Sequence, residues 1–451
     1  MSAIEITKES LDEIKGFIEL QHKDKLNPIL EKLYPADIAE LFNDINLDHA
    51  VYISTLLDPQ KKVDVLTELD SDTKLSFLKG YSNSEIAKEF FNYLDSDDAA
   101  DILNAMGPEQ SKEILQLIED RDHSKNISSL LKFPENTAGA LMAKELIKVK
   151  RNWTVKQCTE EIRQQAEDVS KVYTAYVVDE YDELVGWVSL KAILLNKESS
   201  KVDQIFNDNI IFENTHTSGE EVANTMQKYN LVALPIVDTF NRLVGRVTFD
   251  DVLDYVKDEA EKDYQMLSGI TESVESSDSV WLNTRARIPW LIIGLFGGIA
   301  SSLVIGNFEK ELVDNVQLAL FMPLIMAMAG NVGVQSSSIV VQGLANNSIS
   351  NAGLWKALGK ELAVAFINGL VCSSLLMGYG YIFGNSSVIM ITVSIALFSV
   401  ILLAAIIGTT VPLTLDKLKI DPALATGPFI TTSNDLIGLF LYFLIGNAIL
   451  G

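Results

Sequence analysis

Apolar residues dominate the last third of the chain, in stretches long enough to cross a lipid bilayer as helices. A transmembrane helix needs about 20 predominantly apolar residues, and five stretches near or above this length follow one another. They lie at 288–308, 316–341, 362–383, 388–413 and 423–450. Because five such stretches in succession exceed what a soluble core of this size needs, the pattern predicts a membrane domain with five spans over residues 285–451.

The region before the membrane domain begins with a pattern typical of short helices. Up to residue 131, amphipathic segments follow proline or side-chain capping signals, which favour the first turn of a helix. These segments lie at 33–41, 57–66, 94–103 and 106–115. Their irregular spacing indicates a helical superhelix over residues 1–131 rather than a strict solenoid.

Between residues 132 and 256 the pattern changes to short strands and helices, and it occurs twice. Residues 173–194 are echoed by 231–253, each as strand, turn, strand and helix. The second copy resembles the Gly-x-Val-[Ser/Thr]-x-x-Asp signature of CBS domains. The matching residues are Gly245, Thr248 and Asp251, whereas the first copy has Gly186 and Ser189 but Ala192 in the acidic position.

The CBS resemblance implies a tandem α+β pair, with domains over 132–203 and 204–256. In that family the signature hydroxyl and carboxylate can hold the ribose of an adenine nucleotide, so Thr248 and Asp251 imply one regulatory ATP site. An empty pair that serves as a spacer and dimer platform is the alternative. The chain has no P-loop, no Ser/His/Asp set and no paired cysteines, so we expect no enzyme.

The acidic charge belongs entirely to the first 284 residues. The chain carries 36 Lys and Arg against 61 Asp and Glu, a formal net charge of -25, whereas residues 285–451 contain seven of each sign. The 29 basic and 54 acidic residues that precede them form a surface that attracts cations, so we expect no nucleic-acid partner.

Basic residues beside the spans predict the orientation of the chain. If the N-terminus is inside, six of them face the cytoplasm and one faces out, as the positive-inside rule requires. The six are Arg285, Arg287, Lys356, Lys360, Lys417 and Lys419. We therefore expect a cytoplasmic N-terminus and, after five spans, Gly451 outside.

Two of the five spans carry polar runs that lipid does not accommodate. The second span is polar over 330–338 and the fifth over 428–435, whereas spans one, three and four are apolar enough to be a lipid-facing scaffold. Asp435 is the only ionisable residue well inside a span. Near the expected midplane, an Asp costs about 2.5–3.5 kcal/mol on insertion scales, so its presence calls for a partner or a function.

A cation site is the interpretation of Asp435 that the neighbouring side chains favour. One carboxylate among neutral hydroxyl and amide oxygens suits Mg²⁺, a hard ion that keeps several of its waters. The neutral oxygens come from Asn331, Gln335, Thr431, Thr432 and Asn434. A protonated Asp435 that joins helices by a hydrogen bond and a proton-relay carboxylate are the alternatives.

Acidic residues recur at helical spacing in two segments of the first 284 residues. After the second CBS copy, one row comprises Asp250, Asp254, Asp258 and Glu261, and another comprises Asp251, Glu259 and Asp263. The helical domain has a similar cluster, Asp95, Asp97, Asp98 and Asp101. Like charges four residues apart destabilise a helix, and a bound divalent ion removes the repulsion. A solvated acidic face explains either cluster alone, but both together, beside a cation pathway, predict a cytosolic ion sensor that closes the pathway.

The domain order and three motifs resemble the MgtE family of magnesium channels or transporters, over essentially the whole chain. The motifs lie at 133–142, 330–336 and 421–435. The resemblance implies a homodimer in the bacterial inner membrane, with a pore lined by spans two and five and a connecting helix over 257–284 that gates it. It also implies a hydrated Mg²⁺ at Asp435 with the backbone of Thr431 nearby.

The same resemblance places the cytosolic Mg²⁺ ligands at six acidic residues. They are Asp97, Asp101, Asp251, Asp254, Glu259 and Asp263. Two positions depart from the family pattern, because Val334 stands where Asn is frequent and Lys262 stands where an acid is frequent.

The expected fold is thus a multidomain membrane protein: a helical N-terminal superhelical domain, an α+β tandem CBS pair, a connecting helix and a five-helix transmembrane domain. The expected function is a Mg²⁺-selective uptake channel that cytosolic Mg²⁺ closes. The alternatives are an ion-coupled secondary transporter that exports Mg²⁺, Co²⁺ or Mn²⁺, and a membrane-anchored nucleotide sensor.

Overall fold

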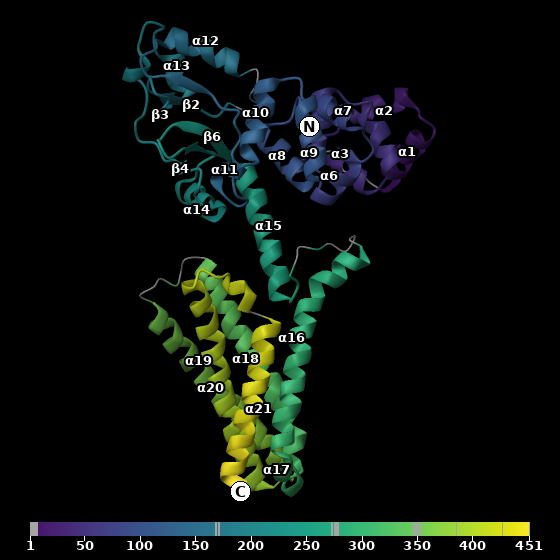
Figure 1. Ribbon diagram of the computed structural model, residues 1–451, viewed down its shortest axis with the longest axis vertical. Helices are drawn as coiled ribbons and strands as arrows, with labels where there is room; N and C mark the ends of the chain where they lie inside the picture. Colours follow the sequence, from purple (N-terminus) through teal and green to yellow (C-terminus); the bar gives the residue numbers. More distant parts are fainter. Residues whose placement is uncertain are drawn as a thin grey trace. The chain divides into compact units, whose positions relative to one another are not determined.

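The computed structural model describes residues 8–166, 169, 172–271, 274, 279–345, 349, 353–384, 386–425 and 427–450 (Figure 1). The chain divides into two compact units, Met1–Val256 and Lys257–Gly451. The first unit contains the predicted helical domain and the two α+β copies, and the second contains the five predicted spans.

The N-terminal part of the first unit is a series of short helices, as the capping pattern predicts. Proline occupies the first turn of three of them, where its missing N–H is not needed. In one of these three helices, the one that begins at Pro59, the Asp58 carboxylate also caps the first turn by accepting from the backbone N–H of Lys61 at 3.0 Å. The helices are α1 (Lys8–Glu19), α2 (Lys23–Leu30), α3 (Pro35–Asn43), α4 (Leu47–Ser54), α5 (Pro59–Thr67), α6 (Ser71–Leu78), α7 (Asn83–Ile86), the π-helical η1 (Ala87–Phe91), α8 (Ser96–Ala105), α9 (Pro108–Leu117) and α10 (Arg121–Leu130).

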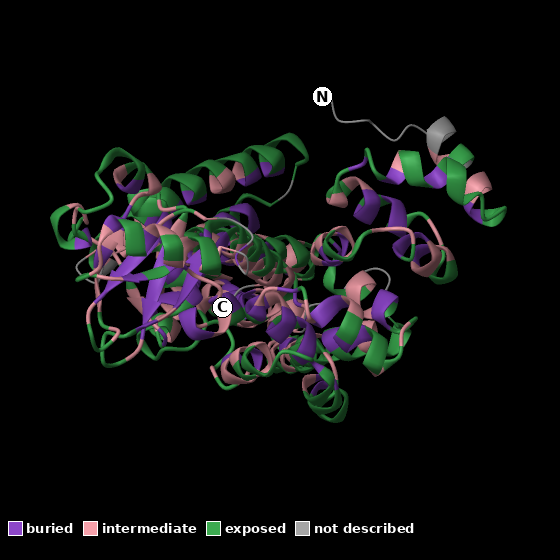
Figure 2. Ribbon diagram, turned by 90° about the horizontal axis from the view of Figure 1, so that it is seen from above, coloured by how far each residue is buried: buried purple, intermediate pink, exposed green. Residues whose placement is uncertain are grey.

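The two α+β copies have the same sheet topology, which confirms the predicted repeat. Each sheet has three strands in sequence order, the first pair parallel and the second antiparallel. Gly186 and Gly245 lie at equivalent positions, opposite Val177 and Ile236, and the register shifts directly after both partners. Figure 2 shows the strands largely buried beside helices with exposed outer faces.

The elements of the first copy are α11 (Ala138–Leu141), β1 (Lys148–Lys150), α12 (Val155–Gln165), β2 (Ala175–Val178), β3 (Leu184–Val188), α13 (Leu190–Leu195) and the 3₁₀ turn η2 (Val202–Gln204). Those of the second copy are β4 (Glu213–Asn214), α14 (Gly219–Tyr229), β5 (Ala233–Val237) and β6 (Leu243–Thr248). The helix α15 (Phe249–Leu267) follows β6 directly and contains the acidic helix predicted over 250–264.

The helical domain and the second copy share one apolar core. Buried residues of the helices, such as Ile114 and Leu130, belong to the same cluster as Leu234 and Val247 of the second copy. The first copy has a core of its own, around Val177. Because the second copy folds against the helices, the start of α8 lies near the end of β6.

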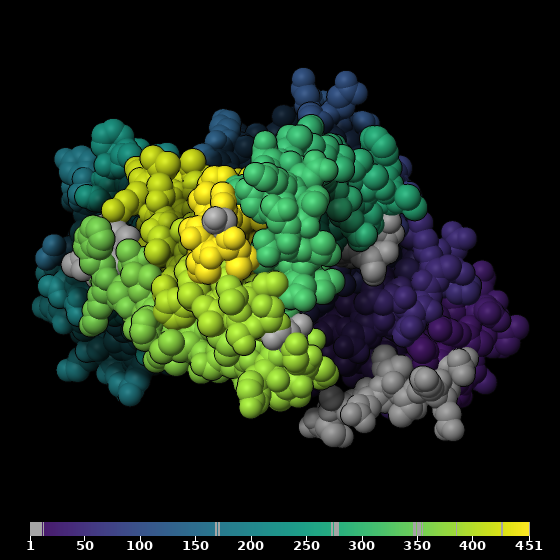
Figure 3. Space-filling view, turned by 90° about the horizontal axis from the view of Figure 1, so that it is seen from below, coloured from purple at the N-terminus to yellow at the C-terminus, as the bar shows by residue number. Residues whose placement is uncertain are grey.

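Among its described residues, the second unit has five helices long and apolar enough to span a membrane, at the five predicted places. The hydroxyl of Tyr442 donates to the carbonyl of Leu318 at 2.8 Å and so joins the last helix to the second. Figure 3 shows the end of the fifth membrane helix between the first and the fourth membrane helices, and it contacts both of them. The elements are α16 (Val280–Asn307), α17 (Glu309–Asp314), α18 (Gln317–Ala345), α19 (Leu354–Ile382), α20 (Ser387–Lys417), the 3₁₀ turn η3 (Pro422–Ala425) and α21 (Pro428–Leu450).

The fourth span is central in this unit, so its prediction as lipid-facing scaffold is wrong. The helix α20 contacts α18, α19 and α21. It is buried along most of its length, for example at Val393, Val400 and Ala404. Lipid tails and a protein interior are equally apolar, so hydrophobicity alone does not separate a buried span from a lipid-exposed one.

Candidate functional site

The polar runs of α18 and α21 face each other across a close helix contact. A Cβ atom on Gly330 would lie 3.0 Å from Cγ2 of Thr431 and 3.2 Å from Oδ1 of Asp435. One turn further along α18, a Cβ on Gly333 would lie 1.8 Å from Nδ2 of Asn434. Small residues on α18 therefore permit the approach, and the structure brings together the two runs that the sequence singles out.

Several polar atoms at this contact have no hydrogen-bond partner among the described residues. They are Oδ1 of Asp435 and both amide atoms of Asn434, whose side chain is 1% exposed. The hydroxyl of Thr431, by contrast, donates to the carbonyl of Gly427 at 3.0 Å. A buried polar atom without a partner costs about 1–3 kcal/mol, so oxygens of Asp435 and Asn434 are available to an ion or to its waters.

Asp435 lies closer to one end of its helix than the sequence predicts. The predicted fifth span starts at residue 423, but α21 starts at Pro428 because the residues before it form the separate turn η3. At 1.5 Å per residue, Asp435 is about 10 Å from the first residue of α21 and about 6 Å from its middle. The predicted midplane position is therefore corrected toward the N-terminal end of α21.

The two polar residues predicted on span two lie on a different part of its surface. Asn331 and Gln335 are one turn apart on α18, and both are exposed. In the described part of the chain, neither forms a hydrogen bond with Asp435. Polar side chains on the surface of a span face water or another protein surface rather than lipid.

Glu361 is a buried carboxyl on a membrane helix that the sequence pattern did not single out. It lies on α19, is 9% exposed, and accepts a hydrogen bond from the hydroxyl of Ser336 on α18 at 3.1 Å. The predicted third span begins at residue 362, whereas α19 begins at Leu354, so this carboxyl lies inside the helix. The polar pair of Lys360 and Glu361 directly before an apolar stretch is the signal that could have found it.

An acidic cavity of about 540 Å³ lies where the start of α8 meets the end of β6 and the start of α15. Its acidic lining from α8 and α15 comprises Asp95, Asp97, Asp98, Asp250 and Asp251. Glu145 fixes the first turn of α8, because its carboxylate accepts from the backbone N–H of Ser96 at 3.1 Å and from the Ser96 hydroxyl at 2.8 Å. The structure thus brings together Asp97 and Asp251, two of the predicted sensor residues.

Burial is the main cause of the raised pKa values of the carboxyl groups in this cavity. It raises the pKa of Asp95 to about 6 and the pKa of Asp98 to about 7. It raises the pKa of Asp97 well above its usual range, and the neighbouring Asp98 carboxylate adds to the effect. It also raises the pKa of Asp251, although the hydrogen bonds from Thr248 act in the opposite direction. A cation among these groups would favour their ionised forms.

Asp97 and Asp251 differ in their hydrogen bonds, and this difference affects how each could bind a cation. The side chain of Asp97 is 8% exposed, and its Oδ1 has no hydrogen-bond partner among the described residues. Asp251 already accepts from the backbone N–H of Thr248 at 3.0 Å and from the Thr248 hydroxyl at 2.5 Å. The Thr248–Asp251 pair predicted for a nucleotide ribose therefore lines the same acidic cavity.

The other predicted sensor residues do not line this cavity. Asp101 is exposed one turn further along α8, and Asp254 is exposed on α15. Glu259 and Asp263 lie on α15 within the second unit, where Lys262 pairs with Glu259 at 3.4 Å. Among the described residues, no three His, Cys, Asp or Glu side chains form a group that could hold a metal ion. Mg²⁺ that is bound through one or two carboxylates usually keeps several of its waters.

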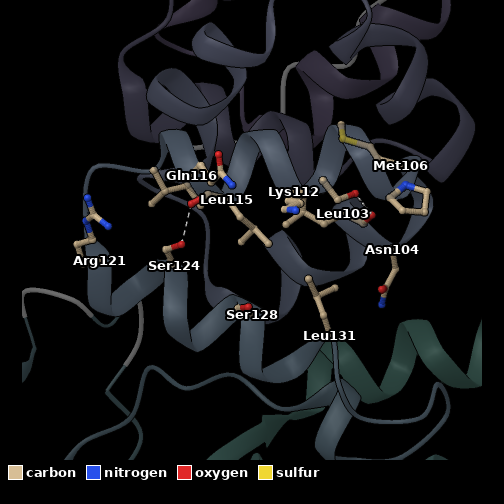
Figure 4. A pocket seen from close by; sticks show the side chains of 13 residues that line it. Leu103, Asn104, Met106, Lys112, Leu115, Gln116, Arg121, Ser124, Ser128 and Leu131 are labelled. Carbon is tan, nitrogen blue, oxygen red and sulfur yellow. Dashed lines mark hydrogen bonds between the residues drawn. The ribbon is translucent and has the colours of Figure 1, made fainter.

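A separate cavity of about 780 Å³ lies among α8, α9 and α10. Its lining combines apolar side chains, such as Leu103 and Leu115, with the basic side chains of Lys112 and Arg121 (Figure 4). None of the predicted site residues lines it.

Comparison with known proteins supports the domain order along the whole chain. The family profile described as divalent cation transporter matches residues 322–445, that of the MgtE intracellular N domain matches 33–136, and that of the CBS domain matches 138–198 and 202–258.

Two curated relatives match nearly the full length. The chain is 31% identical over 420 residues to the magnesium transporter MgtE of Bacillus subtilis, with 93% of each chain covered. It is 30% identical over 433 residues to the magnesium transporter MgtE of Thermus thermophilus, with 94% of this chain and 95% of the relative covered. The crystal structure of the soluble part of a magnesium transporter is 25% identical and covers 56% of this chain and 99% of its own, with a TM-score of 0.51.

Five spans with polar runs in contact, joined to an acidic unit that contains a CBS pair, define a membrane transporter of the divalent-cation class. The chain belongs to the MgtE family of magnesium transporters.

Proposed function

We propose that the chain is a Mg²⁺-selective channel that takes up magnesium across the bacterial inner membrane. The observation that carries the proposal is the α18–α21 contact, where a carboxyl oxygen of Asp435 and the buried amide of Asn434 have no partner among the described residues. One carboxylate among neutral oxygens suits Mg²⁺, because this ion dehydrates reluctantly and binds through retained waters.

A homodimer would complete this site. Two chains that meet along α18 and α21 would place a second Asp435 beside the first and supply the charge that one chain lacks. The exposed Asn331 and Gln335 fit the polar wall of such a pore. The basic residues beside the spans support a cytoplasmic first unit and an external C-terminus.

Measurement of Mg²⁺ flux into liposomes tests the proposal, with Asp435→Ala and the isosteric Asp435→Asn. Asp416→Asn is the matched control, because Asp416 is an exposed acid at the end of α20. We expect both Asp435 variants to lose flux by tenfold or more and the control to keep it. Unchanged flux and selectivity in both Asp435 variants, with intact assembly, would overturn the pore assignment.

A secondary transporter that exports Mg²⁺, Co²⁺ or Mn²⁺ is the alternative with the same geometry. It needs a coupling ion, whereas a channel conducts down the Mg²⁺ gradient alone. Current carried by Mg²⁺ without any Na⁺ or proton gradient therefore supports the channel, and current that requires such a gradient supports the transporter.

Closure by cytosolic Mg²⁺ is the second part of the proposal. A dication that contacts Oδ1 of Asp97 and the carboxylate of Asp251 would offset the repulsion in the acidic cavity and hold α8 against α15. Asp101, Asp254, Glu259 and Asp263 remain predicted ligands for further ions outside this cavity. Regulatory ATP at Thr248 and Asp251 also remains a prediction, and the surrounding carboxylates favour its Mg²⁺ complex over the free anion.

The end of α15 and the residues that follow it lie close to the start of α21. A Cβ on Gly427, whose φ is 59°, would lie 2.4 Å from the carbonyl of Leu267 in the last turn of α15. A Cβ on Gly269 would lie 2.6 Å from Cγ of Pro428, the first residue of α21. Because glycine at both positions lets the two segments pack this closely, a displacement at the end of α15 would reach the helix that carries Asp435. This contact supports the connecting helix as the gate.

A further inference from the structure

Arg246 is held firmly at the wall of the acidic cavity. It lies on β6, opposite Pro235 of β5. Its backbone N–H donates to the carbonyl of Ala143 at 2.9 Å, and its carbonyl accepts from the N–H of Ala143 at 2.8 Å. The side chain is 5% exposed, and its Cζ lies 5.7 Å from the centre of the Tyr173 ring. The backbone is therefore fixed by its pairing, and the guanidinium is buried beside the Tyr173 ring.

The charges around Arg246 are almost all negative. It is the one basic side chain among the described residues that line the cavity. The acidic side chains that line the same cavity are Asp64, Glu68, Asp95, Asp97, Asp98, Asp250 and Asp251. A guanidinium does not lose its proton in a protein, so this positive charge is permanent. It attracts the carboxylates and repels any other cation that enters.

We propose that Arg246 is a tethered counter-charge that stands in for the divalent ion in the metal-free cavity and lowers the affinity of the cavity for that ion. The proposal rests on the sensor proposed above. In the absence of Mg²⁺, the guanidinium offsets part of the repulsion among the carboxylates and keeps α8 against β6. When Mg²⁺ binds, the same guanidinium repels it, so the chain responds only to a higher Mg²⁺ concentration.

The size of the cavity sets the expected effect. A volume of about 540 Å³ corresponds to a width of about 10 Å, so a bound dication stays within that distance of the guanidinium. At the effective dielectric constant of partly buried sites, repulsion across this distance weakens binding by at least about fivefold, even after screening by salt, and by more at shorter distances. Loss of the charge in Arg246→Gln should therefore tighten Mg²⁺ binding by about tenfold while it loosens the metal-free junction.

Hydrogen exchange of the backbone amides of α8 in the full-length protein separates these two effects. If only the closed junction binds Mg²⁺, the ion raises the protection factor of α8 by the ratio 1 + [Mg²⁺]/Kd. We expect Arg246→Gln to reduce the protection of α8 in EDTA. If the native chain binds Mg²⁺ with a Kd on the order of 1 mM, the same variant should raise this ratio about tenfold at about 10 mM Mg²⁺. NaCl at equal ionic strength is the control for screening, and unchanged exchange in β5 shows that the fold is intact.

Three outcomes would overturn the inference. Equal protection in EDTA and an equal Mg²⁺ response in Arg246→Gln and the native chain would refute the counter-charge and leave the sensor standing. A Mg²⁺ response that is absent from both proteins would refute the sensor and, with it, this inference. Arg246→Lys keeps the charge without the planar guanidinium, so it must behave like the native chain within about twofold; behaviour like Arg246→Gln would assign the effect to hydrogen bonding instead.

Discussion

Substitution of Gly333 by Ala tests how closely α18 and α21 pack at the proposed pore. The new Cβ would lie 1.8 Å from Nδ2 of Asn434 and 2.9 Å from Cγ2 of Ile430. Ordinary contacts begin near 3.4 Å, so the overlaps are about 1.6 and 0.5 Å. The Asn434 amide is 1% exposed and has little room to rotate. On the other side, the carbonyl of Gly333 would lie 2.5 Å from a Cβ on Gly408, so α20 prevents α18 from moving back.

The overlap therefore has to separate the helices or displace Asn434, which directly precedes Asp435. Overpacking of this kind costs about 1–3 kcal/mol. For a unit of this size that cost corresponds to a fall in Tm on the order of 2–12 °C. We expect the same variant to reduce Mg²⁺ flux in liposomes, because the displaced side chain is next to the proposed ion ligand.

Gly298→Ala is the matched control for Gly333→Ala. Gly298 lies on α16, and a Cβ there meets nothing within 4 Å, so neither Tm nor flux should fall. Thermal unfolding in detergent and the liposome assay read out both variants. A Gly333→Ala protein with native Tm and native flux would refute the tight α18–α21 contact and the site built on it.

Two further predictions concern the buried acids of the two units. In EDTA, the stability of the first unit should fall as the pH rises from 5 to 8. The folded-state pKa values of Asp95, about 6, and of Asp98, about 7, lie above the usual value of 3.8, so the folded state binds more protons than the unfolded state over this range. A Tm that rises with pH would contradict this prediction. Ser336→Ala should lower the stability of the second unit by about 1–3 kcal/mol, because it removes the hydroxyl that donates to the buried Glu361 carboxyl at 3.1 Å. Ser338→Ala, at a partly exposed position, is the control. Equal Tm values for the two variants would show that this hydrogen bond does not stabilise the unit.

The membrane helices could be predicted from the sequence because length and hydropathy alone determine whether a segment can span a bilayer. Their arrangement could not be predicted in the same way, as α20 shows. The residues that place it in the centre are small or fitted to neighbours, such as Gly408 against Gly333. Such contacts are properties of pairs of helices, and a single hydrophobic pattern does not contain them.

The candidate sites divide along a similar line. The polar run of each pore helix was visible in the sequence, and so was Asp435, because a carboxyl in an apolar run is costly. Glu361 was missed because it lies near the start of its helix, where a charged residue in the sequence looks like the flank of a span. In the first unit, Asp97 and Asp251 could be predicted as members of separate acidic rows, but their common cavity depends on the packing of α8 against the second CBS copy.

Two basic side chains, Lys262 and Arg246, lie beside predicted acidic ligands. Their burial determines which of them has the larger effect on Mg²⁺ binding. Lys262 lies 3.4 Å from Glu259, but the two side chains are 40% and 38% exposed. An exposed ion pair contributes at most about 1 kcal/mol, so Mg²⁺ can displace this lysine with a loss of affinity of no more than about fivefold. Arg246 carries the same charge at 5% exposure, on a strand that is paired with β5. Lys262 therefore weakens one predicted ligand, whereas Arg246 acts on the carboxylates that line its cavity. The Mg²⁺ concentration at which the proposed sensor responds should depend mainly on Arg246.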